Sequence, residues 1–312
     1  MEPFLRQGWL ARCLFGGAAA VLLVACPAIF VPVADDNSEP PYCTVYNHLV
    51  KSGGTSIKLQ LMQSSAEEHS RRPGLCTSDG STAIGECYQA LHNSSVIMGY
   101  GELLRNPLRD IGRQCDWFTM MRHPIDQIVS AFYYCPGHDV QRRPLKWCGD
   151  APDQPGSLRS RLLEFARLKW INMTYRQMLH SIFCQPTFKL CPPHLARDRY
   201  SRPYHINTTE SRETLSKIQE IMLTYTAVGL MSEWELSMEL FDATIKSPVR
   251  KWNHHETHNP GTESPERVAL LKWAHVDPEL RSILAADLLL YSFGVLIFKH
   301  QTSATLGTVW DK

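Results

Sequence analysis

The sequence lacks an excess of charge of either sign. Its 312 residues include 32 lysines and arginines against 31 aspartates and glutamates, which gives a formal net charge of +1. Proteins that bind nucleic acid usually carry a clear positive excess, so we expect no nucleic-acid partner. No Cys-x-x-Cys pair and no internal repeat occurs. Thiol redox catalysis and a zinc ribbon are therefore unsupported.

The sequence also lacks a zinc-protease motif, although residues 253–258 come close to one. They read Asn-His-His-Glu-Thr-His, whereas His-Glu-x-x-His would need a histidine where Asn259 stands. The Asn-Pro-Gly that follows is typical of a loop. We therefore expect a polar loop here and no bound metal ion.

One long apolar run is present near the amino terminus. Residues 13–33 contain no charged side chain and follow Arg6 and Arg12. The run is long enough to cross a hydrocarbon core as a helix, and the arginines favour a cytoplasmic amino terminus. The expected organisation is a cytoplasmic tail (1–12), a transmembrane signal anchor (13–33), a short stem (34–41) and one lumenal domain (42–312). A cleaved signal peptide and a lipoprotein signal are the alternatives.

Cysteine usage and glycosylation signals agree with export. Eight of the ten cysteines lie beyond the apolar run, an even number that fits disulfide bonds in an oxidising compartment. The favoured pair is Cys184 with Cys191, which enclose a proline-containing loop. Further candidate pairs are Cys76–Cys87 and Cys135–Cys148. Three Asn-x-Ser/Thr tripeptides fit a glycoprotein, at Asn93, Asn172 and Asn207.

Strand-like and helix-like segments alternate along the rest of the chain. In addition to the strands of the two segments discussed next, strands are expected at residues 95–99 and 224–230. Helices are expected at residues 158–183, 211–223, 233–245, 265–274 and 278–299. This alternation predicts an α/β fold of three layers, in which helices flank a central parallel sheet and a ligand binds at the carboxyl ends of the strands.

Residues 44–62, TVYNHLVKSGGTSIKLQLM, read as a short strand, a turn and a helix. Gly53 and Gly54 allow a tight turn, and N–H groups at a helix amino terminus attract anions. A phosphate over residues 53–56 would find several donors, and Lys51 would add a full positive charge. This is not a Walker A loop, because there the lysine follows the second glycine. A plain glycine turn with a solvated lysine is the alternative.

Residues 116–135, DWFTMMRHPIDQIVSAFYYC, read as a second strand followed by a helix. Pro124 suits the first turn of that helix, which places Arg122 at the carboxyl end of the strand. Ser130 follows about two turns later, so its hydroxyl can share a second phosphate with Arg122. A structural salt bridge and an incidental helical serine are the alternative.

Together the two segments resemble the signature pair of the sulfotransferases that use 3′-phosphoadenosine 5′-phosphosulfate (PAPS). The first resembles their 5′-phosphosulfate loop. The second resembles their 3′-phosphate element, which here consists of Arg122, Pro124, Val129, Ser130 and Phe132. The likeness is greatest to the Golgi membrane-bound carbohydrate sulfotransferases of the heparan sulfate and uronyl 2-O type, and it covers about residues 42–298. It implies a P-loop-like fold, PAPS as co-substrate, no metal, and a catalytic domain in the Golgi lumen.

The resemblance also assigns roles to residues. Lys51 is expected beside the bridging oxygen of PAPS, where it stabilises or protonates the leaving nucleotide. The residues expected to bind PAPS are Lys51, Ser52, Gly53, Gly54, Thr55, Ser56, Arg122, Ser130, Arg250 and Lys251. Of these, Arg250 and Lys251 match the segment that closes over the nucleotide, and a solvated basic turn is their alternative.

The sequence departs from this family in the residue that would act as the general base. The 2-O enzymes have a histidine after the second strand, whereas this chain has Met-Gly-Tyr-Gly-Glu at residues 98–102. Glu102 is the expected substitute, because a carboxylate in a crevice can have its pKa raised toward the working pH. Tyr100, His48 and His92 are further candidates, and a glutamate that positions substrate or caps a helix is the alternative.

The expected partner is a glycan acceptor, and we expect this glycan to be an acidic polysaccharide. Three basic clusters could line a groove for it, although solvated loops would look the same: 71–72, 142–146 and 197–202. Two other functions stay open, a lumenal P-loop kinase and a non-catalytic membrane-anchored protein that binds a glycan or a nucleotide. A homo-oligomer is compatible with the sequence, which does not identify the acceptor sugar or the position sulfated.

Overall fold

The computed structural model describes residues 43–49, 51–67, 75–77, 96–99, 105–110, 112–137, 156–169, 178, 209–246, 252 and 264–310. The chain divides into two compact units, Met1–Ser38 and Glu39–Lys312, and all described residues belong to the second. The predicted tail, anchor and stem therefore lie outside the described residues. None of the helices in the described ranges combines the length and the apolar character that a membrane crossing needs.

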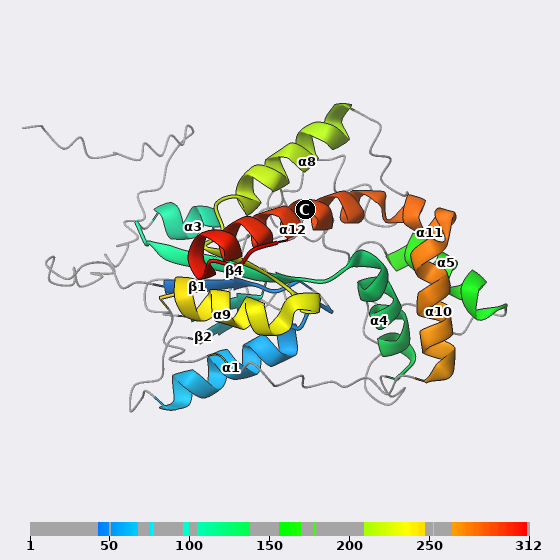
Figure 1. Cartoon of the computed structure of the whole chain (residues 1–312), viewed down its shortest axis with the longest axis horizontal. Helices are drawn as coiled ribbons and strands as arrows, with labels where there is room; N and C mark the ends of the chain where they lie inside the picture. Colours follow the sequence, from blue (N-terminus) through cyan, green and yellow to red (C-terminus); the bar gives the residue numbers. More distant parts are fainter. Residues whose placement is uncertain are drawn as a thin grey trace, which may run out of the picture. The chain divides into compact units, whose positions relative to one another are not determined.

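Five parallel strands form one sheet in the order β2-β3-β1-β4-β5 (Figure 1). The strands are β1 (Cys43–Asn47), β2 (Leu75–Thr77), β3 (Val96–Gly99), β4 (Cys115–Met121) and β5 (Ala227–Leu230). After β1 the chain builds one side of the sheet with β2 and β3, and it then crosses β1 to build the other side with β4 and β5. The strand order therefore reverses between β1 and β4, and in α/β sheets ligands bind at the carboxyl ends of the strands at such a point.

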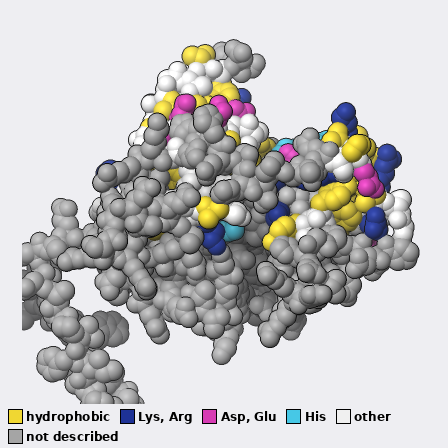
Figure 2. Space-filling view, turned by 90° about the horizontal axis from the view of Figure 1, so that it is seen from below, with side chains coloured by type: hydrophobic (Ala, Val, Ile, Leu, Met, Phe, Trp, Pro, Cys, Tyr) yellow, Lys and Arg dark blue, Asp and Glu magenta, His cyan; other side chains and the backbone are white. Residues whose placement is uncertain are grey.

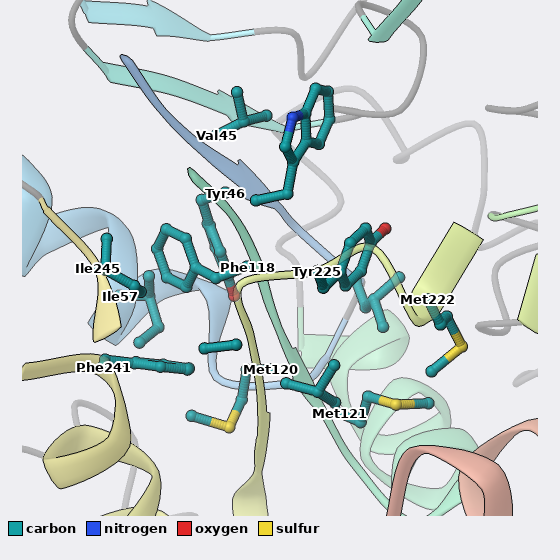
Figure 3. Close-up of a cluster of buried hydrophobic side chains, with 14 of the residues drawn as sticks. Val45, Tyr46, Ile57, Phe118, Met120, Met121, Met222, Tyr225, Phe241 and Ile245 are labelled. Atoms are coloured by element: carbon teal, nitrogen blue, oxygen red, sulfur yellow. The ribbon is translucent and has the colours of Figure 1, made fainter. Parts of the chain in front are cut away.

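Helices flank this sheet on both faces. They are α1 (Gly54–Glu67), α3 (Arg105–Asp110), α4 (Pro124–Gly137), α5 (Leu158–Lys169), α8 (Thr209–Met222), the 3-10 turn η4 (Met231–Glu233), α9 (Trp234–Thr244), α10 (Pro265–Val276), α11 (Pro278–Ile283) and α12 (Ala285–Leu306). Neighbouring side chains on a strand point to opposite faces, so Met120 lies near Phe241 of α9 whereas Met121 lies near Gly294 of α12 (Figure 3). The predicted α/β fold with a parallel sheet and flanking helices is confirmed.

The main hydrophobic core lies around β1 and β4. Tyr46 and Phe118 are fully buried on neighbouring strands, with ring centroids 4.9 Å apart. Phe241 of α9 and Trp252 meet the Phe118 ring edge-on at 5.0 and 5.6 Å, a geometry that aromatic rings favour (Figure 3 labels Tyr46, Phe118 and Phe241). These contacts fix the two central strands, and hence the loops that follow them.

A second hydrophobic cluster joins α4 to α5, α10 and α11. The α4 residues Ile125, Ile128, Val129 and Phe132 follow helical spacing and are buried in it. Their spacing leaves the opposite face of α4, with Asp126, Ser130 and Tyr134, outside this cluster. Helix α4 thus has an apolar face that is buried in the second cluster and a polar face on its opposite side.

One long helix expected at residues 278–299 is in fact two. The chain breaks at Leu284, where φ is −96° and ψ is 16°, between α11 and α12. Leu280 and Leu284 are buried in the second cluster, whereas Leu290 and Phe298 of α12 are buried in the main core. A straight helix would not serve both cores, so the axis changes direction. The short elements β2 and α3 were not expected from the sequence either.

A disulfide bond joins Cys43 to Cys115 at the amino ends of β1 and β4, where the two residues are register partners and their Cα atoms are 4.4 Å apart. The expectation that the chain forms disulfides is thus confirmed, but this pair was not among the expected ones. The favoured pair, Cys184 and Cys191, lies outside the described residues. Spacing along the sequence could not find the observed pair, because it follows from which strands are neighbours.

We expect replacement of both cysteines, Cys43→Ala with Cys115→Ala, to lower the free energy of unfolding by about 2–4 kcal/mol. The bond closes a loop with a sequence separation of 72 residues and so restricts the unfolded chain. Urea denaturation of the full chain measures the change. Reduction of the wild type should produce at least the same loss, and a double variant as stable as the wild type would contradict the prediction.

Candidate functional site

The two strand-to-helix junctions singled out from the sequence meet at the carboxyl ends of β1 and β4. Asn47 ends β1 opposite Thr119 of β4, whose hydroxyl donates a hydrogen bond to the Asn47 carbonyl oxygen at 2.7 Å. Just beyond, Arg122 Nη1 donates to the Lys51 carbonyl oxygen at 3.3 Å. The structure therefore brings Lys51 and Arg122 together, and their contribution to one site stays a prediction.

The loop between β1 and α1 forms the tight turn that its two glycines predict. The Ser52 N–H donates to the Leu49 carbonyl oxygen, and Gly53 has φ of 75°. A side chain on Gly54 would overlap the His48 imidazole. Helix α1 begins at Gly54, and its first N–H groups lack an earlier turn to donate to. This is the geometry of an anion-binding helix terminus.

The Lys51 ammonium lies over the ring of Tyr134 in α4, with Nζ 3.7 Å from the ring centroid. A cation at this distance is attracted by the negative face of the ring. The pKa of the ammonium is lowered from 10.5 to about 8, chiefly because burial removes water from it, and further because Arg122 and Arg267 are positively charged. Lys51 is thus a lysine that can release its proton near physiological pH.

Arg122 shares this positive environment. Its pKa is lowered mainly by burial and further by the charge of Arg267, while the nearby carboxylate of Asp126 opposes the change. Within the described part of the chain, none of Lys51, Arg122 and Arg267 forms an ion pair. Like charges gathered without a direct ion pair repel one another, and the arrangement therefore favours a bound anion.

The polar face of α4 continues the site. Asp126, Ser130 and Tyr134 are spaced by four residues and so lie along one side of the helix. Asp126 contacts His275 of α10 at one end, and Tyr134 contacts Lys51 at the other. Ser130 lies between them along the helix and is half-buried, and its predicted role in phosphate binding stays a prediction.

A group of two histidines and a carboxylate lies beside Arg122. The ligating atoms of His123, Asp126 and His275 are all within 4.8 Å of one another, a donor set that can hold a metal ion. His275 Nε2 is 2.8 Å from Asp126 Oδ1, and the Ile125 N–H donates to His123 Nδ1 at 3.3 Å. A neutral His123 then has its proton on Nε2, so metal binding through Nε2 would require the other tautomer. The sequence-based expectation of no metal stays a prediction.

The pKa of His123 is lowered, mainly by burial and also by the positive charges of His275 and Arg281, while Asp126 opposes the change. Tyr291 of α12 meets the His123 ring edge-on at 5.2 Å. His123 is therefore a neutral, packed residue that supports the start of α4.

The other predicted site residues have mixed outcomes. Ser52 is fully buried, and its hydroxyl has no hydrogen-bond partner within the described residues. Thr55 is exposed at the start of α1, whereas Ser56 is largely buried. His48 packs beneath the loop, with its ring stacked on Tyr46. The remaining candidates lie outside the described residues: His92, Tyr100, Glu102, Arg250 and Lys251.

Sequence reasoning missed three contributors: Tyr134, Arg267 and His275. Tyr134 could have been found, since it follows Ser130 by four residues on a predicted helix. Arg267 and His275 share one side of α10 in the same way, but only the packing of α10 on α4 brings them to the site. No pattern in the sequence gives that packing.

Figure 2 shows that side chains of both charge signs and hydrophobic side chains are interspersed over the described part of one face. The described part of this face therefore shows no broad basic patch.

A scan of the sequence against protein-family models found no match, and a search of the curated proteins found none either. The resemblance to the sulfotransferases therefore depends on the two motifs and on the geometry that brings them together.

We expect Lys51→Met to raise the free energy of unfolding at neutral pH, because it removes a charged, partly buried ammonium. The gain should be only about 1 kcal/mol, because solvent still reaches the ammonium and screens its repulsion by the nearby cations. Below a pH of about 8 the wild type bears the cost of a charged, partly buried lysine. Between about 8 and 10.5 the folded protein has lost this proton while the unfolded chain keeps it, so the wild type gains stability.

Urea denaturation across this pH range measures the difference between Lys51→Met and the wild type, which should shrink as the pH rises. Lys272→Met, at an exposed position of α10, is the control and should show no such trend. A Lys51→Met variant that is less stable than the wild type at neutral pH would contradict the lowered pKa.

Proposed function

We propose that the protein is a PAPS-dependent carbohydrate sulfotransferase that transfers a sulfuryl group to a hydroxyl of a glycan. The observation that carries the proposal is the contact between Arg122 and Lys51, which unites two phosphate-binding motifs at the point where the strand order reverses. A nucleotide with phosphates at both its 5′ and 3′ positions matches two anion sites on adjacent junctions. The proposal includes the three-layer, P-loop-like fold and the type II anchor in the Golgi membrane that the resemblance implies.

In this proposal the loop after β1 binds the 5′ end of the donor. The N–H groups at the start of α1 and the hydroxyls of Thr55 and Ser56 bind the 5′-phosphate, while Gly54 keeps the backbone close to it. Arg122 and Ser130 bind the 3′-phosphate, which distinguishes PAPS from ATP. Arg250 and Lys251 close over the nucleotide.

Lys51 stabilises the leaving group. As the acceptor oxygen forms its bond to sulfur, the bond from sulfur to the bridging oxygen breaks, and negative charge develops on that oxygen. Lys51 stabilises the negative charge on the bridging oxygen or donates a proton to it. A lysine with a pKa of about 8 is a better proton donor than an ordinary lysine. Glu102 accepts the proton of the acceptor hydroxyl.

A transfer assay with labelled PAPS tests the proposal across heparan, chondroitin, dermatan and algal-type polysaccharides. We expect the wild type to label at least one of them, and Lys51→Ala to lower the rate roughly 100-fold or more, as loss of a transition-state charge partner does elsewhere. Lys272→Ala is the matched control and should keep its activity. An unchanged rate in Lys51→Ala would refute the role of Lys51, and a wild type that binds PAPS but labels no glycan would favour a non-catalytic binding protein.

A binding measurement tests the 3′-phosphate site separately. We expect adenosine 3′,5′-bisphosphate to bind more tightly than adenosine 5′-monophosphate, and Ser130→Ala to weaken only the bisphosphate, roughly 10-fold, since one hydrogen bond to a charged group is lost. Calorimetric titration measures both ligands. Ser292→Ala, at an exposed position of α12, is the control. Equal affinity of the wild type for the two nucleotides would contradict a 3′-phosphate site.

A further inference from the structure

Helix α10 runs antiparallel to α4 and brings a stripe of side chains to it that is polar at both ends. Arg267, Leu271 and His275 are spaced by four residues on α10 and so lie on one side of it, and the apolar Leu271 in the middle packs on the second hydrophobic cluster. His275 contacts Asp126 near the start of α4, and the Arg267 guanidinium lies 5.6 Å from the ring centroid of Tyr133 near its end. Along α4, Ser130 therefore lies between the residues that make these two contacts.

In the fold, the Arg267 guanidinium contacts an aromatic ring but no opposite charge within the described residues. Its backbone N–H is satisfied by the Ser264 hydroxyl, which caps α10, but its half-buried guanidinium pairs with no carboxylate in the described part of the chain. Asp126, the acidic residue on the facing side of α4, is bonded to His275 at the far end of the stripe. The guanidinium can therefore accept an anionic partner.

The charge of Arg267 acts on both cations identified from the sequence. It lowers the pKa of Lys51 and that of Arg122, which requires that it lie near each of them. A third positive charge at this place raises the cost of the empty site and increases the gain when a multiply charged anion binds.

We propose that Arg267 is a third cationic residue of the donor site and binds the 3′-phosphate together with Arg122 and Ser130. The assignment to the 3′-phosphate follows from the contact of Arg267 with Tyr133 of α4, which lies three residues beyond Ser130, whereas the loop before α1 binds the 5′ end in the proposed function. This inference rests on the proposed function. It adds a residue from the carboxyl-terminal part of the chain that neither motif contains.

Calorimetric titration of the full chain with adenosine 3′,5′-bisphosphate and with adenosine 5′-monophosphate tests the inference. We expect Arg267→Gln to weaken the bisphosphate roughly 10- to 100-fold, since a charge-assisted contact is lost, and to leave the monophosphate within about twofold. Lys272→Gln is the matched control, because it removes the same charge from an exposed position of the same helix. It should bind both nucleotides as the wild type does.

Arg267→Lys separates loss of the contact from damage to the fold. It keeps the positive charge but not the planar, bidentate donor set, so we expect a bisphosphate affinity between those of Arg267→Gln and the wild type. Thermal unfolding of each variant without ligand checks that the fold is kept. If Arg267→Gln fails to fold, Arg267→Lys alone decides, and wild-type affinity in it overturns the inference.

The outcomes separate the inference from the proposed function. A wild type that prefers the bisphosphate, with an unchanged Arg267→Gln, overturns the role of Arg267 and leaves the function intact. Equal losses for both nucleotides overturn its assignment to the 3′-phosphate. A wild type without any preference for the bisphosphate overturns the proposed function and the inference with it.

Discussion

The parallel pairing of β1 with β4 is the constraint on which the site depends. The two strands are held at their amino ends by the bond between Cys43 and Cys115 and along their length by the Tyr46 and Phe118 rings. At their carboxyl ends the backbone of Lys51 meets the guanidinium of Arg122. A slip of one residue would move one junction by about 3.3 Å and separate this pair. The register of one strand pair therefore sets the geometry of the anion site.

Helix α4 connects these two junctions to the helices that follow it in the chain. Its apolar side is buried with α5, α10 and α11, and its polar side contacts Lys51 and His275 of α10. The apolar contacts offset the repulsion among cations that have no ion pair within the described residues. The site is thus a locally unfavourable arrangement that a favourable core keeps in place, which is common where proteins bind charged ligands.

The local elements of the site could be predicted from the sequence, but its assembly could not. Lys51 and Arg122 could be predicted because each lies at a strand-to-helix junction. Such a junction is recognised in the sequence from glycines, a proline and strand-forming residues that lie within a few positions of one another. The pairing of Cys43 with Cys115 follows from strand order, and the contact of Arg267 with Tyr133 follows from helix packing; no local pattern records either. The break at Leu284 was missed for a similar reason, since helical spacing continues through it while the buried side turns from one core to the other.

The backbone of Lys51 adds a consequence for evolution. With φ of 61°, it adopts a left-handed conformation that glycine or asparagine takes at a much lower cost than lysine. Strain of this kind costs about 1–3 kcal/mol and is found most often at functional sites. Under the proposed function, glycine or asparagine at this position would relieve the strain and raise heat resistance, but would remove the amine. Retention of a lysine here in related sequences would then indicate selection for the amine rather than for stability.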